Sequence, residues 1–240
     1  MSGHVWNGSA WERVKTMHVW NGTAWEQIKE TWRWTGSGWE LLYARPVAIV
    51  DDFNRANSSS LGSLWNKVGT NTGISSNTLA FTGSSDGSGG AVTVGQINND
   101  DGYAEVVMGT MGSSTNTSDT SLFVRCNSAG TSALSLNIFN NKIYLSKFSH
   151  ASGLAAGNNG QGMTDIASNT SATIGTGDTV RLEFVGDNYT VKRNGTTILT
   201  ASDSSVSRGP GQRYGALRLE RNPFANSAAI NSYKLADIGA

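Results

Sequence analysis

The sequence predicts an all-β protein, in which a β-sandwich or jelly roll follows a small module of β-hairpin repeats. Three observations carry this prediction. Short runs that alternate apolar and polar residues are separated by turn signals about every eight to twelve residues. The composition combines 29 glycines with only 3 prolines and 15% charged residues, which suits short strands joined by tight polar turns. The first 44 residues contain three near-copies of one short unit. No amphipathic helical pattern of about ten residues or more is evident.

The repeated unit is 14 residues long in its first two copies. The copies read HVWNGSAWERVKTM at 4–17, HVWNGTAWEQIKET at 18–31 and WRWTGSGWELLYA at 32–44. Asn-Gly in the first two copies predicts a two-residue hairpin turn, because both central positions of that turn favour positive φ. The third copy has Thr-Gly at the turn, and Trp32 replaces the histidine.

A two-residue turn also predicts the pairing within the first hairpin. Trp6 would pair with Ser9, and His4 would pair with Trp11. Because cross-strand partners share a face, His4, Trp6, Trp11 and Arg13 are expected on one side. The two indoles would then be diagonal neighbours that can pack edge to face.

A unit this short cannot bury its own apolar face, so it must pack on its siblings, on the following domain or on another chain. Aromatic residues on such a module are typical of interfaces. We therefore predict that residues 1–45 form an assembly module, and we weigh sugar stacking as the alternative role of its indoles. A homotrimer is one assembly that the repeats would serve. The expected interface residues are Trp6, Trp11, Trp20, Trp25, Trp32, Trp34 and Trp39.

Residues 46–240 read as one β domain after the linker Ala44-Arg45-Pro46. Asn140-Asn141 and Asn194-Gly195 predict two hairpin turns within it. The expected strands are Leu79–Thr82, Ala91–Gly95, Tyr103–Met108, Ser121–Cys126, Ala133–Phe139, Lys142–Phe148, Thr179–Val185, Tyr189–Arg193, Thr196–Thr200, Tyr214–Glu220 and Ala229–Ala236.

Charge and cysteine content exclude several classes of protein. Lys+Arg and Asp+Glu number 18 each, so a nucleic-acid partner, which would call for a basic face, is not expected. The chain has no run of apolar residues long enough to predict membrane insertion. Its start lacks the pattern of a signal peptide, so we expect synthesis in the cytoplasm without ordinary secretion. Cys126 is the only cysteine, and its alternating apolar context predicts a buried, inert thiol.

The sequence offers little for catalysis. Glycoside hydrolysis usually needs two carboxylates across a cleft, and beyond residue 44 the glutamates Glu105, Glu183 and Glu220 are far apart in sequence. Glu105 and Glu183 alternate with apolar residues, which indicates the solvated face of a strand. A Ser-His-Asp triad would have to use His150, which we interpret as a surface histidine. We therefore predict a protein that is not an enzyme.

The sequence does not predict a metal site at the histidines either. His4 and His18 occupy equivalent repeat positions, but too few further ligands exist for zinc, and packing beside indoles is the favoured role. No cofactor is expected. The exception we weigh is calcium in the oxygen-rich loop that contains Asn98, Asp100 and Asp101, although such clusters are also common in ordinary turns.

Sugar binding remains as the functional hypothesis for the large domain. Lectin-like sites combine an aromatic platform with amide-rich loops, because sugar hydroxyls need many directional partners. The segment His150–Ser171 has no evident strand, and structureless loops of that length are often functional. We interpret Trp65 as a core residue. The candidate contact residues are Tyr103, Tyr144, Asn158, Asn159 and Gln161.

Two segments carry a resemblance to a known family. Asp51-Asp52-Phe53-Asn54-Arg55 is followed by Leu61-Gly62-Ser63-Leu64-Trp65, and the chain closes with Tyr214–Leu219 and Ala228–Ile238. These features resemble concanavalin A/laminin-G-like jelly-roll domains. The resemblance covers roughly residues 47–240 and implies a lectin-like sandwich.

The Trp repeats extend the resemblance. Jelly rolls preceded by V-W-N-G-x-x-W units are similar to minor tail or surface proteins of tailed phages that infect actinobacteria. This implies a virion protein, a minor tail or tail-tip protein for host adhesion, that binds other virion proteins through its repeats and a host-surface glycan through its jelly roll. The alternatives are a capsid decoration protein and, in a different class, a secreted glycan-binding module or glycoside hydrolase.

Overall fold

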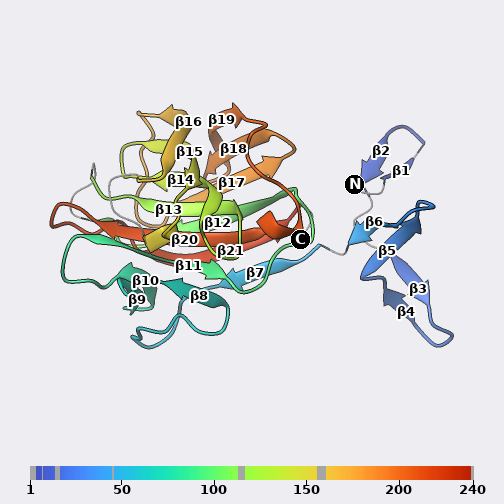
Figure 1. Ribbon diagram of the computed structural model, residues 1–240, viewed down its shortest axis with the longest axis horizontal. Coiled ribbons are helices and arrows are strands. Elements are labelled where there is room, and N and C mark those ends of the chain that lie inside the picture. Colours follow the sequence, from blue (N-terminus) through green and yellow to red (C-terminus); the bar gives the residue numbers. More distant parts are fainter. Residues whose placement is uncertain are drawn as a thin grey trace.

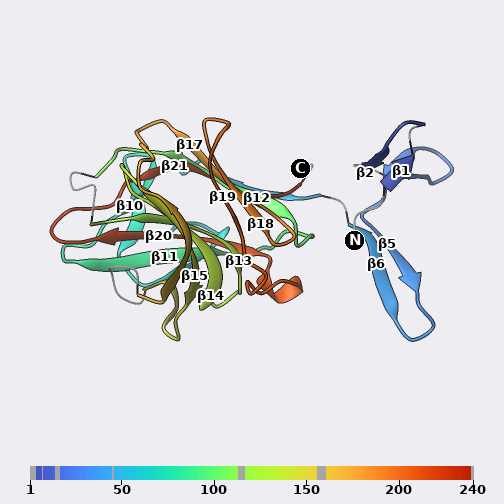
Figure 2. The same cartoon turned by 90° about the horizontal axis from the view of Figure 1, so that it is seen from above.

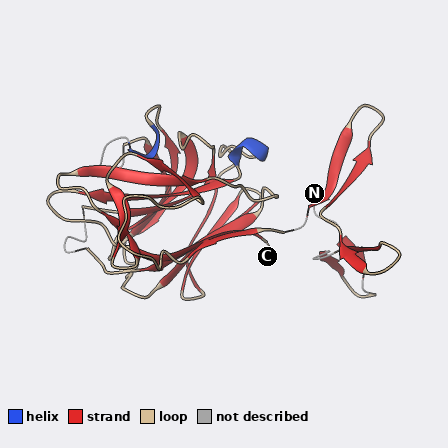
Figure 3. Ribbon diagram, turned by 90° about the horizontal axis from the view of Figure 1, so that it is seen from below, coloured by secondary structure: helices blue, strands red, loops and turns tan. Residues whose placement is uncertain are grey.

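The computed structural model describes residues 4–6, 8–13, 17–44, 46–112, 117–155 and 161–238. Strands dominate it, and the helices that it describes are two short 3-10 turns, η1 (Gly153–Ala155) and η2 (Pro210–Gln212) (Figure 3). Neither of these turns has the length or the apolar character needed to cross a membrane. The all-β fold class predicted from the sequence is confirmed.

Two antiparallel sheets form the sandwich (Figure 1). In spatial order, the larger sheet consists of β19 (Thr196–Ser202), β18 (Asn188–Arg193), β17 (Thr179–Val185), β12 (Gly102–Met108), β21 (Ile230–Asp237), β10 (Thr78–Phe81) and β9 (Thr72–Ser75), and β7 (Ala48–Asp51) also pairs with β21. The smaller sheet consists of β16 (Met163–Asn169), β15 (Ile143–Ser149), β14 (Ser132–Ile138), β13 (Thr120–Cys126), β20 (Tyr214–Arg221), β11 (Gly87–Thr93) and β8 (Trp65–Val68).

All eleven strands expected from the sequence are present, with ends shifted by a few residues. Four strands of the sandwich were not expected, namely β7, β8, β9 and β16. The first three have only 4 residues each, too few to show a period. Strand β16 corrects the expectation of a strandless loop over His150–Ser171. Its residues are mostly polar and partly exposed at a sheet edge, so apolar alternation is weak there.

The core lies between the two sheets. Inward side chains of β13, such as Leu122 and Val124, pack with those of β12 and β17, such as Val106 and Leu182. A second apolar cluster lies on the outer face of the smaller sheet, where Leu154 of η1 joins the following residues: Val92, Phe123, Cys126, Ala133, Phe148 and Ala216. Cys126 is buried there, as predicted, and burial raises the pKa of its thiol to about 12.

The D-x-F-N-R motif has a structural role. The Asp51 carboxylate accepts hydrogen bonds from the Phe53 amide at 2.9 Å, from both Nη atoms of Arg55 at 2.7 and 2.9 Å, and from Trp65 Nε1 at 2.7 Å. The Trp65 ring stacks on Phe53 and meets the ring of Tyr233 edge-on. The interpretation of Trp65 as a core residue is confirmed, since it is 6% exposed.

Three separate two-stranded hairpins precede the sandwich: β1 (His4–Trp6) with β2 (Trp11–Arg13), β3 (His18–Trp20) with β4 (Trp25–Gln27), and β5 (Glu30–Trp34) with β6 (Trp39–Ala44). The predicted register was wrong. Trp6 lies opposite Trp11, and Trp20 lies opposite Trp25. The loop therefore has four residues, because the Asn21 side-chain oxygen accepts bonds from the amides of Thr23 and Ala24.

Each described Trp pair projects into solvent. The rings of Trp20 and Trp25 lie 5.7 Å apart, and those of Trp34 and Trp39 lie 5.5 Å apart, both at steep interplanar angles. Trp6, Trp20, Trp25, Trp32, Trp34 and Trp39 are 49–69% exposed, whereas the side chain of Trp11 lies outside the described residues. The assembly interface and the boundary between residues 1–45 and 46–240 stay predictions.

Candidate functional site

The predicted glycan-contact residues do not gather at one place. The ring of Tyr103 is 6% exposed and lies under the cations of Arg181 and Lys234, so it does not offer an open platform. Tyr144 is half-buried on β15 beside Phe139. Gln161 is exposed, and Asn158 and Asn159 lie outside the described residues.

In the loop that contains Asn98, Asp100 and Asp101, protein donors occupy one oxygen of each carboxylate. Asp100 Oδ1 accepts bonds from Arg213 Nε at 2.7 Å and from the Gly209 amide at 3.1 Å, and Asp101 Oδ1 accepts one from the Gly186 amide. These carboxylates serve protein donors. Across the described residues, no group of three or more His, Cys, Asp or Glu side chains is arranged to hold a metal ion.

The glutamates likewise serve the fold. Glu105 and Glu183 flank Arg181 on the outer face of the larger sheet, at 2.8 and 3.6 Å, and both are partly exposed, as the strand pattern predicted. Glu220 is 1% exposed and pairs with Arg218 at 2.9 Å. Burial, together with the nearby charge of Asp119, raises the pKa of Glu220 to about 9, so its carboxyl keeps a proton at neutral pH.

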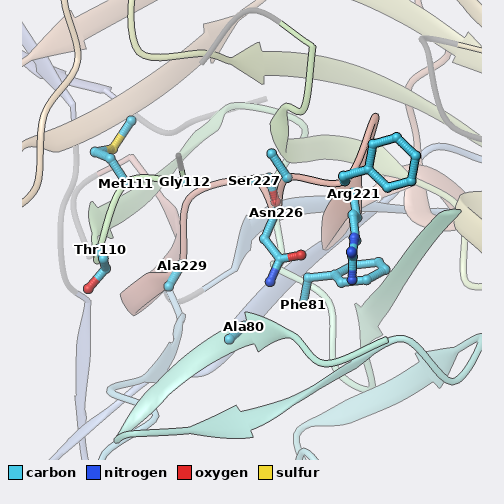
Figure 4. Close-up of a pocket in the computed structure, with 11 residues that line it drawn as sticks. Ala80, Phe81, Thr110, Met111, Gly112, Arg221, Asn226, Ser227 and Ala229 are labelled. Carbon is cyan, nitrogen blue, oxygen red and sulfur yellow. The ribbon is translucent and has the colours of Figure 1, made fainter. Parts of the chain in front are cut away.

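A pocket of about 400 Å³ lies at one end of the sandwich (Figure 4). Its walls come from β10, from the segment after β12 and from the turn that joins β20 to β21. The lining residues are Ala80, Phe81, Thr110, Met111, Gly112, Arg221, Phe224, Ala225, Asn226, Ser227 and Ala229. None of these described residues is a carboxylate.

Phe224 is the unusual member of this set. Asn222 donates to the Ala225 carbonyl at 3.0 Å, so Pro223 and Phe224 are the central residues of a two-residue turn. Phe224 has φ +62° and is 83% exposed. A proline followed by positive φ is the pattern of a type II turn, whose second central position favours glycine. A bulky residue there is a strained outlier, and such strain is concentrated at functional sites.

The turn is held firmly despite this strain. Ser118 Oγ lies 2.7 Å from the carbonyl oxygens of both Asn222 and Ala225, to either of which it can donate its one proton, and it accepts from the Asn222 amide at 2.8 Å. The Phe224 amide donates to Asp86 Oδ1 at 3.0 Å. These bonds hold the backbone that carries the exposed ring.

Two polar groups that line the pocket are available to a ligand. Figure 4 shows the Asn226 carboxamide reaching toward Ala80 and Phe81. Within the described part of the chain, this carboxamide and the Thr110 hydroxyl make no side-chain hydrogen bond, and both residues are exposed. Arg221, in contrast, lies 3.6 Å from Asp86 and donates to the Ser84 carbonyl.

Gly112 is required for the shape of the wall. A Cβ at this position would collide with the carbonyl oxygen of Asn226, so the two segments can approach this closely only with glycine. Gly109 and Ala229 join the same segments through a backbone bond of 2.8 Å. Two loops from different parts of the chain thus form one continuous wall.

Sequence reasoning did not single out this site. Its only sequence signal is Asn222-Pro223-Phe224, where an Asn-Pro turn places an aromatic residue at a position that favours glycine. The partners Ser118 and Asp86 come from distant segments, and no spacing rule connects them to the turn.

The fold has known counterparts. No family model matches the chain, and no curated protein matches it. Among solved structures, the carbohydrate-binding module CBM66 from Bacillus subtilis is similar with a TM-score of 0.52 and 15% identity, over 70% of this chain and 91% of that one. The metal-free exoplasmic/lumenal domain of VIP36 has a TM-score of 0.55 and 14% identity, over 79% and 91%.

A third similar structure is LamAcat from Zobellia galactanivorans, with a TM-score of 0.50 and 10% identity, over 78% of this chain and 96% of that one. At these identities the likeness concerns the fold. The sandwich is a concanavalin A-like jelly roll, and the resemblance seen in the sequence is confirmed to that extent.

Proposed function

We propose that the jelly roll binds a glycan, without catalysis, in the pocket beside Phe224. The observation that carries this proposal is an exposed aromatic ring at the rim of an open pocket, on a strained turn whose backbone is held by hydrogen bonds. An apolar ring face suits the C–H face of a sugar, and nothing in the turn itself requires an aromatic residue. A strained residue that the fold does not need is best explained by a ligand.

The polar groups of the pocket suit the same class of ligand. A sugar hydroxyl donates and accepts, and the Asn226 carboxamide and the Thr110 hydroxyl each offer a donor and an acceptor. The pocket volume of about 400 Å³ falls in the range of small-molecule sites. Two of the similar structures support the proposal by analogy of fold: one is a carbohydrate-binding module, and VIP36 has been solved in a Ca²⁺/Man3GlcNAc-bound form.

The absence of catalysis is part of the proposal. Hydrolysis of a glycosidic bond needs an acid and a second carboxylate on either side of the bond, and the described pocket residues provide neither. Glu220, whose raised pKa would suit a general acid, is 1% exposed and bonded to Arg218. It has no access to a substrate.

Isotope-labelled protein titrated with a panel of oligosaccharides tests this function. We expect amide shifts at Thr110, Met111 and Asn226, with Phe224 ring contacts to the sugar. The matched control is Ser76→Gly, which changes a positive-φ residue in the β9–β10 turn and should bind like the parent protein. Sugar concentrations on the order of 10 mM that shift none of the pocket residues would overturn the proposal.

We propose further that the Trp hairpins join the jelly roll to a larger particle. Strand β21 has 8 residues, so its ends lie about 25 Å apart. The pocket adjoins the turn at its start, while Ala48, where the chain arrives from the hairpins, pairs with Ala236 near its end. Figures 1 and 2 show the turn between β20 and β21 at the end of the sandwich opposite to the end at which the chain arrives from the hairpins. An anchor at one end and a binding site at the other suit outward display.

Sedimentation of full-length protein and of residues 46–240 tests the anchor. The shorter chain should stay folded and monomeric, and the full chain should associate with itself or with partner proteins. Replacing Trp20 and Trp25 by serine should weaken that association. Val19→Ser, on the opposite face of the same hairpin, is the matched control. Unfolding of the shorter chain would contradict the two-part division.

The particle that we favour is a tailed-phage virion, with this protein as a minor tail or tail-tip adhesin. The support is the resemblance of the repeats together with their exposed indoles. Electron cryo-microscopy of particles that carry the chain distinguishes the alternatives. Density at the tail tip agrees with the adhesin, and density on the capsid shell would identify a decoration protein instead. Absence from every particle would favour a secreted glycan-binding module.

A further inference from the structure

A second opening adjoins the pocket on the other side of its wall. This slot has a volume of about 10 Å³, roughly the space of one water molecule. It shares Met111, Gly112, Asn226 and Ser227 with the pocket, and it adds residues from the end of β14, among them Phe139 and Asn140. The wall formed by these four shared residues therefore has an opening on both sides.

One residue that lines the slot has a side-chain acceptor without a donor. The side-chain oxygen of Asn140 is buried, and it accepts no hydrogen bond from the residues that the structure describes. A buried acceptor left in this state is unfavourable, so it normally has a partner. The backbone carbonyl of Asn140 already accepts from the Ile174 amide, so the side chain is not needed to hold the turn.

Aromatic residues continue the surface beyond the slot. Phe139 meets Tyr144 edge-on with ring centroids 6.0 Å apart, and the Lys142 ammonium lies 4.6 Å from the centre of the Phe139 ring. Tyr144, which the sequence put forward as a sugar contact, thus lies next to a residue that lines the slot.

We propose that the pocket and the slot are consecutive subsites for one linear oligosaccharide of two or more sugar units. This rests on the glycan-binding function proposed above. One unit stacks on Phe224 and bonds to Asn226 and Thr110. The next unit crosses the wall, and one of its hydroxyls donates to Asn140 in place of the water that fits there. Phe139 flanks this second unit, and Asn140 determines specificity for chain length.

Binding of matched mono-, di-, tri- and tetrasaccharide series to the full-length protein tests this proposal. For the series that binds best, we expect affinity to rise about tenfold from one unit to two or three, as one more satisfied hydrogen bond and a further contact predict. Asn140→Ala should abolish that rise and leave monosaccharide affinity unchanged. Because the Asn140 side chain makes no described hydrogen bond, this variant should fold normally.

The experiment distinguishes a failure of the two-subsite proposal from a failure of the proposed glycan binding. Equal affinity for all chain lengths, or a rise that persists in Asn140→Ala, would overturn the two-subsite proposal and leave glycan binding intact. No binding by any series would overturn the proposed function, and with it the subsites. Phe224→Gly supplies the reference, since it should weaken every chain length alike.

Discussion

Replacing Phe224 by glycine is expected to separate binding from stability. A non-glycine residue in the left-handed region costs about 1–2 kcal/mol, and glycine at φ +62° removes that cost. Glycine also gives the unfolded chain more freedom, which costs about 0.4–1 kcal/mol. Because the ring is 83% exposed, its removal gives up little buried surface. The free energy of unfolding should therefore stay level or rise by about 1 kcal/mol.

The affinity of Phe224→Gly for the sugar should fall. A sugar that covers one face of the exposed ring buries about 80 Å² of apolar surface, worth about 2 kcal/mol. Removal of the ring should then raise the Kd roughly thirtyfold. Denaturant unfolding measures the first effect, and titration of the best oligosaccharide measures the second. Phe224→Tyr, which keeps a ring in the strained turn, serves as the control and should retain binding.

Two results would refute this reasoning. A variant that binds as tightly as the parent would show that the ring is not a platform. A loss of more than about 1 kcal/mol in unfolding free energy would show that the ring, despite its exposure, supports the fold. Either result would leave the strain at Phe224 without a functional explanation.

Three further predictions concern the sandwich. Glu220 has a folded-state pKa of about 9 against an ordinary 4.5, so between these values the folded chain holds a proton that the unfolded chain has lost. Stability should fall as pH rises through this window, by at most about 1.4 kcal/mol per pH unit. Glu220→Gln should flatten this dependence of stability on pH. Urea unfolding at several pH values measures both. Burial by itself raises the pKa of Asp51, but hydrogen bonds, that from Arg55 foremost, outweigh it and lower the pKa. The contribution of Asp51 to stability should be present at neutral pH and be lost in acid. Asp51→Ala should lower the free energy of unfolding by about 3 kcal/mol. An unchanged midpoint of chemical unfolding would contradict this. Calcium should leave the Tm unchanged, because Asp100 and Asp101 bond to protein donors; a Tm that rises with calcium concentration would show a site that these bonds do not exclude.

The parts of the fold that the sequence predicted are those that depend on local pattern. Long alternating runs, such as the one that became β17, specify their strands because one face must be buried. The opening motif was also informative, since Asp51, Phe53, Arg55 and Trp65 form one hydrogen-bonded cluster within 15 residues of chain. Short edge strands such as β9 carry no such signal, because 4 residues of mixed polarity can equally form a loop.

The hairpin register shows how a correct signal can give a wrong pairing. Asn-Gly does mark the turn, and Gly22 has φ +101°. The side chain of Asn21, however, accepts bonds from two amides further along, which widens the loop from two residues to four. The shift moves the pairing by two positions, so the residues keep their faces while the indoles of Trp20 and Trp25 become direct partners.

The pocket beside Phe224 could not be predicted because its parts meet only in the folded chain. Ser118 lies about a hundred positions before the carbonyls that it holds, at sequence separations of 104 and 107. Asp86 accepts a hydrogen bond from the Phe224 amide, which lies 138 positions further along the chain. The predicted contacts were chosen by residue type, and Tyr103 shows why type alone is insufficient, since its ring is covered by two cations.

The proposed arrangement explains why a pocket of weak affinity would be sufficient for attachment. One ring face and two polar groups suggest weak binding of a single copy, on the order of 1 mM. Linking several copies makes each later contact intramolecular, and avidity can then exceed the single-site affinity by about 10² to 10⁴. The half-exposed indoles of Trp20, Trp25, Trp34 and Trp39 provide the surface for such linkage, at the end of the sandwich away from the pocket. Under this proposal, deletion of residues 1–45 should leave single-site affinity unchanged while abolishing adhesion to a glycan-coated surface. If the isolated jelly roll adhered as strongly as the full chain, the hairpins would have no part in attachment.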